Sequence, residues 1–334
     1  MAIQVSVIIP CYNGGKFIEA AIESVLLLNR DDIEIIIIND GSTDNTADVL
    51  KKYNDNDKVS IETITNHGAG YARNIGLQKA TGEWIAYLDA DDLFIYGTDL
   101  FKRLSSIDGD TDIIYTPRVK TSFDMEREIE IIYPERKEQV ANKIPRLEFW
   151  TAIYKNGFLK NNNIKFYEFR EQDIETAFRY LTFSKAKKIV IDNDLFFILQ
   201  RENMQSNTHT WNLHKLYRIK MLVYFDLFKQ TEFEEDKEYL FGVAFDCVKK
   251  YTDHSIKNGI EKKDDHKTVI KVVKDMRRYA YPFIPKKELG RILFALRKLL
   301  IINKQISVSK TEEPQNPEIT NKEAIERLKA LKLK

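Results

Sequence analysis

Cysteine is scarce in this chain of 334 residues, and long apolar runs are absent. The two cysteines, Cys11 and Cys247, are too few for a disulfide framework and fit a reducing compartment. No stretch reaches the ~18 apolar residues that a membrane-spanning helix needs. The opening "MAIQVSVIIP" lacks the basic start and the cleavage site of a signal peptide. We therefore expect a cytoplasmic protein, or one lying peripherally on the inner face of the cell membrane.

A strong charge of one sign is also absent. The chain has 52 Lys and Arg against 51 Asp and Glu, for a net charge of +1. This balance lacks the basic signature of a nucleic-acid binder, so we expect no nucleic-acid partner. The length and the 43% of hydrophobic residues suffice for one large domain with an appendage, or for two domains.

Apolar runs alternate with amphipathic stretches from residue 1 to about 105. The runs "VSVIIP", "IEIIIIND", "VSIETIT" and "WIAYLDADD" predict buried strands, and the stretches between them have helical spacing. This alternation predicts an α/β layer with a mostly parallel sheet. Ligands bind beyond the carboxyl ends of such strands. The polar clusters "PCYNGG", "NDGSTD", "NHGAGYARN" and "DADD" all fall there, so one crevice should collect them.

The rest of the chain divides into three stretches. Residues 106–215 are mixed, with strands expected in "TDIIYTPRV" and "KKIVIDNDLFFILQR" and a helix in "EQDIETAFRYLTF". Residues 216–306 have almost entirely helical patterns, and residues 307–334 are predicted to be a linker and a terminal helix. Leucines on one face of residues 289–304, flanked by Arg and Lys, leave two interpretations open, and one is contact with an anionic membrane surface. The alternative is a helix packed on its own domain or on a partner subunit of a homo-oligomer.

Four segments in order carry a family resemblance. "VSVIIPCYNGGKFIEAAIESV", "IIIINDGSTDNT", "GAGYARNIGLQKATGEWIAYLDADD" and "EQDIETAFRY" resemble the family 2 glycosyltransferases, inverting enzymes with the GT-A fold, of the bacterial surface-polysaccharide type. The resemblance implies a Rossmann-like α/β domain with helices on both faces of the sheet. Residues 1–105 would be its nucleotide-sugar-binding half and residues 106–215 its acceptor half. It implies transfer of a sugar from a UDP-sugar to a glycan, a teichoic-acid-like polymer or a glycoprotein glycan.

The first three strand ends offer groups for the nucleotide. Asp40 can accept a hydrogen bond from the imide N–H of uracil, a donor that cytosine lacks, or it can be a turn residue before Gly41. Pro10, Tyr12 and Asn13 stand at the first strand end, where Tyr12 would pack on the base or simply on the rim. Arg73, one turn into a helix, would reach the diphosphate or point to solvent.

Three carboxylates follow the fourth apolar run. Asp89, Asp91 and Asp92 repel one another unless a cation lies between them or water surrounds the turn, and their oxygens suit Mn²⁺ or Mg²⁺. A calcium loop would need Gly where Phe94 stands. A phosphatase-type D-x-D-x-T motif would need Thr or Val at Leu93. The resemblance implies that Asp91 binds the metal, that Asp89 contacts the ribose or the metal's water shell, and that Asp92 orients the sugar or a water.

An inverting transfer also needs a base for the acceptor hydroxyl. The Glu-Asp pair of the family is Gln172-Asp173 here, so Asp173 is the expected base, with Glu171 and Glu175 as alternates and a helix N-cap as the other role for Asp173. His209 is the candidate third metal ligand. We expect His214 on the surface and His67 in a loop near the diphosphate.

Two other classes of protein stay open. One is a relative that keeps the nucleotide-sugar pocket but has lost turnover, against which the intact Asp91 and Asp173 argue. The other is a nucleotidyltransferase. That class carries a glycine-rich activating loop near the first strand, and "PCYNGGKF" has two glycines and Lys16 without that spacing.

Overall fold

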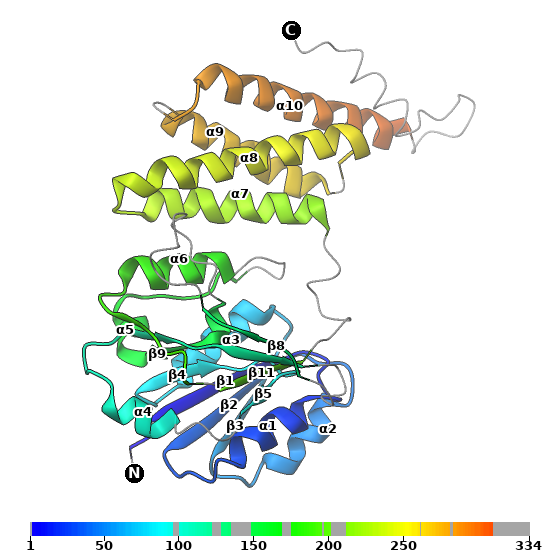
Figure 1. Cartoon of the computed structure of the whole chain (residues 1–334). Helices are drawn as coiled ribbons and strands as arrows, with labels where there is room; N and C mark the ends of the chain where they lie inside the picture. The colour runs from blue at the N-terminus through cyan, green and yellow to red at the C-terminus, as the bar shows by residue number, and fades with distance from the viewer. Residues whose placement is uncertain are drawn as a thin grey trace. The chain divides into compact units, whose positions relative to one another are not determined.

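The computed structural model describes most of the chain, in two compact units (Figure 1). An α/β unit reaches to residue 201, and a helical unit starts at residue 212. The described ranges are 2–95, 100–121, 128–134, 148–168, 175–195, 197–201, 212–260, 262–280 and 283–309.

A seven-stranded sheet forms the centre of the α/β unit, in the order β10-β6-β9-β4-β1-β2-β3. Neighbours among β1 to β4 run parallel, whereas β9 is antiparallel to both β4 and β6. The mostly parallel sheet is thus confirmed, although β9 was not expected. The strand bounds are β1 (Val5–Cys11), β2 (Ile33–Asp40), β3 (Val59–Ile64), β4 (Trp84–Tyr87), β6 (Ile113–Tyr115), β9 (Ala152–Lys155) and β10 (Ile189–Ile191).

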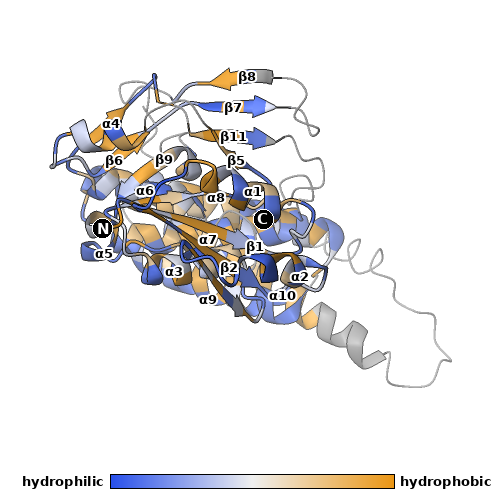
Figure 2. Ribbon diagram, turned by 90° about the horizontal axis from the view of Figure 1, so that it is seen from below, coloured by the Kyte–Doolittle hydropathy of each residue, from blue (hydrophilic) through white to orange (hydrophobic). Residues whose placement is uncertain are grey.

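Helices cover both faces of this sheet. In Figure 1, α3 (Ala69–Lys79) lies on one face, and α1 (Ile18–Leu26) and α2 (Thr46–Leu50) lie on the other. All seven residues of β1 are buried, because helices cover both faces of the sheet. A strand buried on both faces is mostly apolar, and β1 is mainly orange in Figure 2. Gly76 lets α3 lie close to β1, since an added Cβ would stand 2.4 Å from Cγ2 of Ile8. The remaining described helices of this unit are η1 (Lys51–Tyr53), α4 (Leu100–Ser106), η3 (Phe149–Thr151), α5 (Asn156–Asn161) and α6 (Glu175–Lys185).

A second sheet of four strands has the order β5-β11-β7-β8. The stretch 187–201, expected as one strand, supplies both β10 in the first sheet and β11 in the second. A turn separates β10 from β11. The carboxylate of Asp192 stabilises this turn by accepting a hydrogen bond from the N–H of Asp194, and it also forms an ion pair with Arg103 on α4. The bounds are β5 (Leu93–Phe94), β7 (Arg118–Thr121), β8 (Glu128–Ile132) and β11 (Ile198–Arg201).

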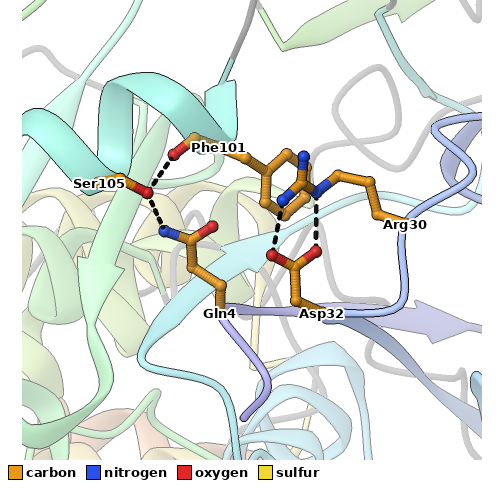
Figure 3. A network of polar contacts seen from close by, with 5 residues as sticks. All are labelled: Gln4, Arg30, Asp32, Phe101 and Ser105. Atoms are coloured by element: carbon orange, nitrogen blue, oxygen red, sulfur yellow. Dashed lines mark hydrogen bonds and ion pairs between the residues drawn. The ribbon is translucent and has the colours of Figure 1, made fainter. Parts of the chain in front are cut away.

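Polar contacts tie α4 to the amino ends of β1 and β2 (Figure 3). Arg30 donates twice to Asp32 at 2.7 Å and lies 4.0 Å from the ring centroid of Phe101. Gln4 donates to the hydroxyl of Ser105 at 3.0 Å. This edge of the sheet is therefore closed by structural contacts, and the polar loops occupy the opposite edge.

The helical unit consists of α7 (Leu213–Gln230), α8 (Glu234–Asn258), α9 (Lys263–Tyr279) and α10 (Lys286–Ser309), with α7 packed along α8 and α9 along α10. Leu289, Leu293, Leu296 and Leu299 of α10 are each at most 5% exposed. The apolar face of α10 is thus packed inside its own unit, which confirms the interpretation of a helix packed on its own domain over that of membrane contact. Among the described residues, no helix is long and apolar enough to cross a membrane.

His214, expected on the surface, is buried, which corrects that prediction. Its Nε2 lies 2.7 Å from the hydroxyl of Ser255, and its ring stacks on Tyr251 at a centroid distance of 4.3 Å. It lies on the inward face of α7, next to α8, so it is a structural residue of the helical unit.

Candidate active site

The loop after β1 is joined to the loop after β2 through Asn13. Its side-chain oxygen accepts from the N–H of Thr43 at 2.8 Å, and its own N–H donates to the hydroxyl of Ser42 at 2.9 Å. Asn13 has a φ of 52°, a left-handed conformation that asparagine tolerates better than most residues. Pro10 is buried within β1, whereas Tyr12 is 51% exposed. The ring of Tyr12 therefore remains available to a ligand at this strand end.

Asp40, the last residue of β2, joins the loop after β3. Its two carboxylate oxygens accept from the N–H groups of His67 and Gly68, at 2.7 and 2.8 Å, and the residue is only 3% exposed. Gly41 has a φ of 70°, and an added Cβ would stand 2.7 Å from the backbone nitrogen of Asn66, so this close approach requires glycine. Asp40 anchors the loop in front of α3.

Arg73 on α3 joins the loop after β4. Its Nη2 donates to Asp89 at 2.8 Å, its Nη1 lies 3.9 Å from Glu175 of α6, and the residue is only 4% exposed. The guanidinium lies over the rings of Phe149 and Phe166, at 4.5 and 5.3 Å from their centroids. Its Nε has no hydrogen-bond partner among the described residues. Arg73 does not point to solvent, so that alternative is wrong.

Glu175 begins α6 beside this arginine. Packing of protein atoms around its carboxyl raises the pKa of Glu175 to about 7; Arg73 opposes this rise, and the charges of Asp89 and Glu148 add to it. The side chain is still 37% exposed, so it can exchange protons with solvent. From the sequence, Glu175 is only an alternate candidate for the base. Its proximity to Arg73, 102 positions earlier, depends on the fold and could not be predicted from local pattern.

The carboxylates after β4 differ in exposure. Asp92 is 5% exposed, and its N–H closes a turn by donating to the carbonyl of Asp89 at 3.0 Å. Asp91 is half-buried, and the side chain of Asp89 is 32% exposed. Within the described ranges, no group of three or more His, Cys, Asp or Glu residues could hold a metal. Two carboxylates nonetheless fit Mg²⁺ or Mn²⁺, because such ions are commonly completed by substrate phosphates and water.

Two of the expected site residues, Asp173 and His209, lie outside the described residues, as do Glu171 and Gln172. Their roles stay predictions. His67 is in the loop before α3, as expected, with its ring stacked on Tyr71 at 4.6 Å. The other expected residues are brought to one edge of the sheet by the contacts described above.

The comparisons with known proteins agree with this arrangement. Residues 6–162 match the model of glycosyl transferase family 2. The uncharacterized glycosyltransferase EpsJ of Bacillus subtilis (strain 168) is 28% identical over 242 residues, covering 66% of this chain and 69% of EpsJ. The uncharacterized glycosyltransferase YibD of Escherichia coli (strain K12) is 46% identical over 90 residues, covering 27% of this chain and 26% of YibD.

Two solved structures resemble the chain over most of its length. Residues 1–349 of S. aureus TarS in complex with UDP-GlcNAc match with a TM-score of 0.58 and 20% identity, covering 96% of this chain and 95% of that one. The mannosyltransferase PcManGT from Pyrobaculum calidifontis, in complex with GDP-Man and Mn²⁺, matches with a TM-score of 0.50 and 14% identity, covering 90% and 88%. These likenesses establish the fold.

The fold and the family match define the class of protein as a GT-A glycosyltransferase. Residues 6–162 form a domain that matches glycosyl transferase family 2, and these residues include the strand ends at which the four loops meet.

Proposed function

We propose that this protein transfers a sugar from a UDP-sugar to an acceptor hydroxyl, with inversion and with the help of a divalent metal ion. The acceptor would be a glycan, a teichoic-acid-like polymer or a glycoprotein glycan, reached from the cytoplasm or from the inner face of the membrane. One observation carries the proposal: Asn13, Asp40 and the Arg73–Asp89 pair link the four strand-end loops at one edge of the sheet.

The uridine preference rests on Asp40 and Tyr12. A carboxylate has about four lone-pair sites, and the backbone N–H groups of His67 and Gly68 use two of them. Asp40 thus retains capacity for the imide N–H of uracil, while the half-exposed Tyr12 can stack on the base. The UDP-GlcNAc of the TarS complex supports this donor class, and the GDP-Man of PcManGT marks its rival.

Asp91 and Asp89 would hold Mn²⁺ or Mg²⁺, with His209 as the proposed third ligand. The bound cation would neutralise charge on the departing nucleoside diphosphate, so no protein acid need protonate it. Arg73 would bind the diphosphate, because its guanidinium is already oriented by two aromatic rings and by Asp89. Asp89 would then exchange its bond to Arg73 for the ribose or for the water shell of the metal.

Asp173 would take the proton of the acceptor hydroxyl as it attacks the anomeric carbon. Glu175 is the competing candidate, because its pKa of about 7 is close to that of an ideal base at neutral pH. Its position beside Arg73, however, supports a role near the diphosphate rather than at the acceptor. We therefore keep Asp173 as the base and give Glu175 a positioning role toward Arg73.

Calorimetry tests the donor class. UDP should bind more tightly than CDP or GDP, and Asp40→Ala should narrow the difference between UDP and CDP. Asp48→Ala is the matched control, because that side chain is 74% exposed on α2 and pairs only with the neighbouring Lys51 in the described structure. Equal affinity of the wild type for all three nucleotides would remove Asp40 from base recognition.

A further inference from the structure

Positive charge is concentrated in the last two described helices. Helix α9 has six Lys and Arg against three Asp and Glu, and α10 has six against one. Together they carry a net charge of +8 in a chain whose net charge is +1. The rest of the chain is therefore net acidic, and an anionic partner would be directed to these two helices.

The outward face of α10 combines this charge with exposed apolar side chains. Phe294 is 55% exposed and Ile301 is 59% exposed, two turns apart on one face of the helix. Exposed Arg291 lies one turn before Phe294, and Nζ of Lys298 lies 4.6 Å from the ring centroid of Phe294. This face is the opposite of the buried leucine face.

Helix α9 is also basic on its exposed side. Lys267, Lys271, Lys274 and Arg278 recur at helical spacing, and all four are exposed. Arg277 connects the two helices, because its guanidinium lies against Gly290, where an added Cβ would stand 3.9 Å from Nη2. Figure 2 shows hydrophilic residues along both helices. We call the exposed residues of α9 and α10 the basic helix surface.

We propose that the basic helix surface docks on an anionic phospholipid bilayer. Lys and Arg would bind the lipid phosphates, and Phe294 and Ile301 would insert between the headgroups, as in interfacial amphipathic helices. A soluble polyanion would need only the charges, so the two exposed apolar side chains favour the lipid. The inference does not depend on sugar transfer, although a bilayer is where a lipid-linked acceptor would lie.

Vesicle sedimentation of the full chain tests the inference. Binding to vesicles with phosphatidylglycerol should exceed binding to pure phosphatidylcholine by ~10-fold or more at low salt, and it should fall as salt rises. Arg291→Glu/Arg297→Glu should abolish the preference. Lys51→Glu/Lys52→Glu, which reverses two exposed charges of the α/β unit, should keep it.

Phe294→Ser/Ile301→Ser separates a bilayer from a soluble polyanion. This variant should lose most vesicle binding, with an unchanged urea midpoint showing that it is folded, and should keep wild-type retention on heparin. If it binds vesicles as the wild type does, the surface recognises charge alone and the bilayer proposal is wrong. Absence of any phosphatidylglycerol preference in the wild type would also overturn it. Neither result bears on UDP release, so the proposed function would stand or fall separately.

Discussion

Arg73 is a buried cation whose surroundings would let a diphosphate replace the carboxylate of Asp89. It is held by one close carboxylate, one carboxylate at 3.9 Å and two aromatic faces, and no described residue accepts a hydrogen bond from its Nε. A guanidinium held in this way needs little reorganisation when a diphosphate replaces the carboxylate. Neither the burial nor the aromatic contacts of Arg73 could be predicted from the sequence, because Phe149 and Phe166 come from segments far along the chain.

Removing the proposed metal ligand tests the carboxylates after β4. Asp91→Ala should lower turnover by ~10²-fold or more, because a major source of charge stabilisation for the leaving group is lost. EDTA should abolish the activity of the wild type, and Mn²⁺ or Mg²⁺ should restore it. Asp55→Ala, an exposed surface carboxylate, is the control and should leave turnover unchanged. Full wild-type activity in EDTA would contradict metal assistance.

Two substitutions separate the base from the positioning residue. Asp173→Asn should lower turnover by ~10²-fold or more with nearly unchanged UDP affinity, since the base contacts the acceptor. Glu175→Gln should mainly weaken donor binding, because the residue lies beside Arg73. Steady-state kinetics with calorimetry distinguishes the two. If Glu175→Gln is inactive while Asp173→Asn turns over normally, the base assignment is wrong.

The difference in stability between Glu175→Gln and the wild type should change with pH. The folded pKa of Glu175 is raised to about 7, so its contribution to stability is present below the ordinary pKa of 4.5 and is lost as pH rises through 7. Glutamine does not ionise, so the variant does not lose this stability as pH rises. The urea midpoint of the variant should therefore increase relative to that of the wild type as pH rises from about 5 to about 8. A constant difference across that range would contradict the raised pKa.

At the scale of elements, the sequence predicts the first hundred residues best. The runs that become β1 to β4 are short, apolar and bounded by turn residues, so local pattern suffices. Strand β9 pairs antiparallel with both β4 and β6, and β10 and β11 belong to different sheets. These pairings join segments far apart in the sequence, so local pattern does not predict them. The amphipathic pattern of α10 was correct, but which of its faces is buried depends on α8 and α9.

A buried histidine links three helices of the helical unit. Nε2 of His266 on α9 lies 2.7 Å from the carbonyl of Leu296 on α10, and Nδ1 lies 3.3 Å from the hydroxyl of Tyr251 on α8. The carbonyl must accept, so Nε2 carries the proton and Nδ1 accepts from Tyr251. Burial lowers the pKa of His266, which favours this neutral form, although the bond to Leu296 opposes the shift.

The helical unit should therefore lose stability in mild acid. The unfolded chain binds a proton near the ordinary histidine pKa of 6.5, while the folded state resists it, so stability falls as pH drops below that value. Hydrogen exchange of amides in α8 to α10 should be faster at about pH 5.5 than at about pH 7.5, after correction for intrinsic rates. His266→Gln should reduce this dependence, whereas His67→Gln in the α/β unit should not. An equal dependence in wild type and His266→Gln would exclude this histidine as the cause.

At the scale of the whole molecule, the α/β unit and the helical unit have separate proposed roles. We propose donor recognition and chemistry at the sheet edge of the α/β unit, and docking on an anionic bilayer at α9 and α10. The sequence predicted the first role from four ordered motifs. For α10 the sequence left two interpretations open, because helical periodicity shows that two faces differ but not which of them neighbouring helices cover.

Nucleotide release shows whether this protein transfers a sugar from a UDP-sugar. Wild-type protein with Mn²⁺ should release UDP from at least one member of a panel of UDP-sugars, slowly with water and faster with a suitable acceptor, and Asp91→Ala should release ~10²-fold less. GDP-mannose should be a poorer donor. Tight UDP binding without release of UDP from any donor would indicate a binding module. Release of pyrophosphate from UTP with a sugar phosphate would indicate a nucleotidyltransferase. Either result would exclude sugar transfer from a UDP-sugar as the function of this protein.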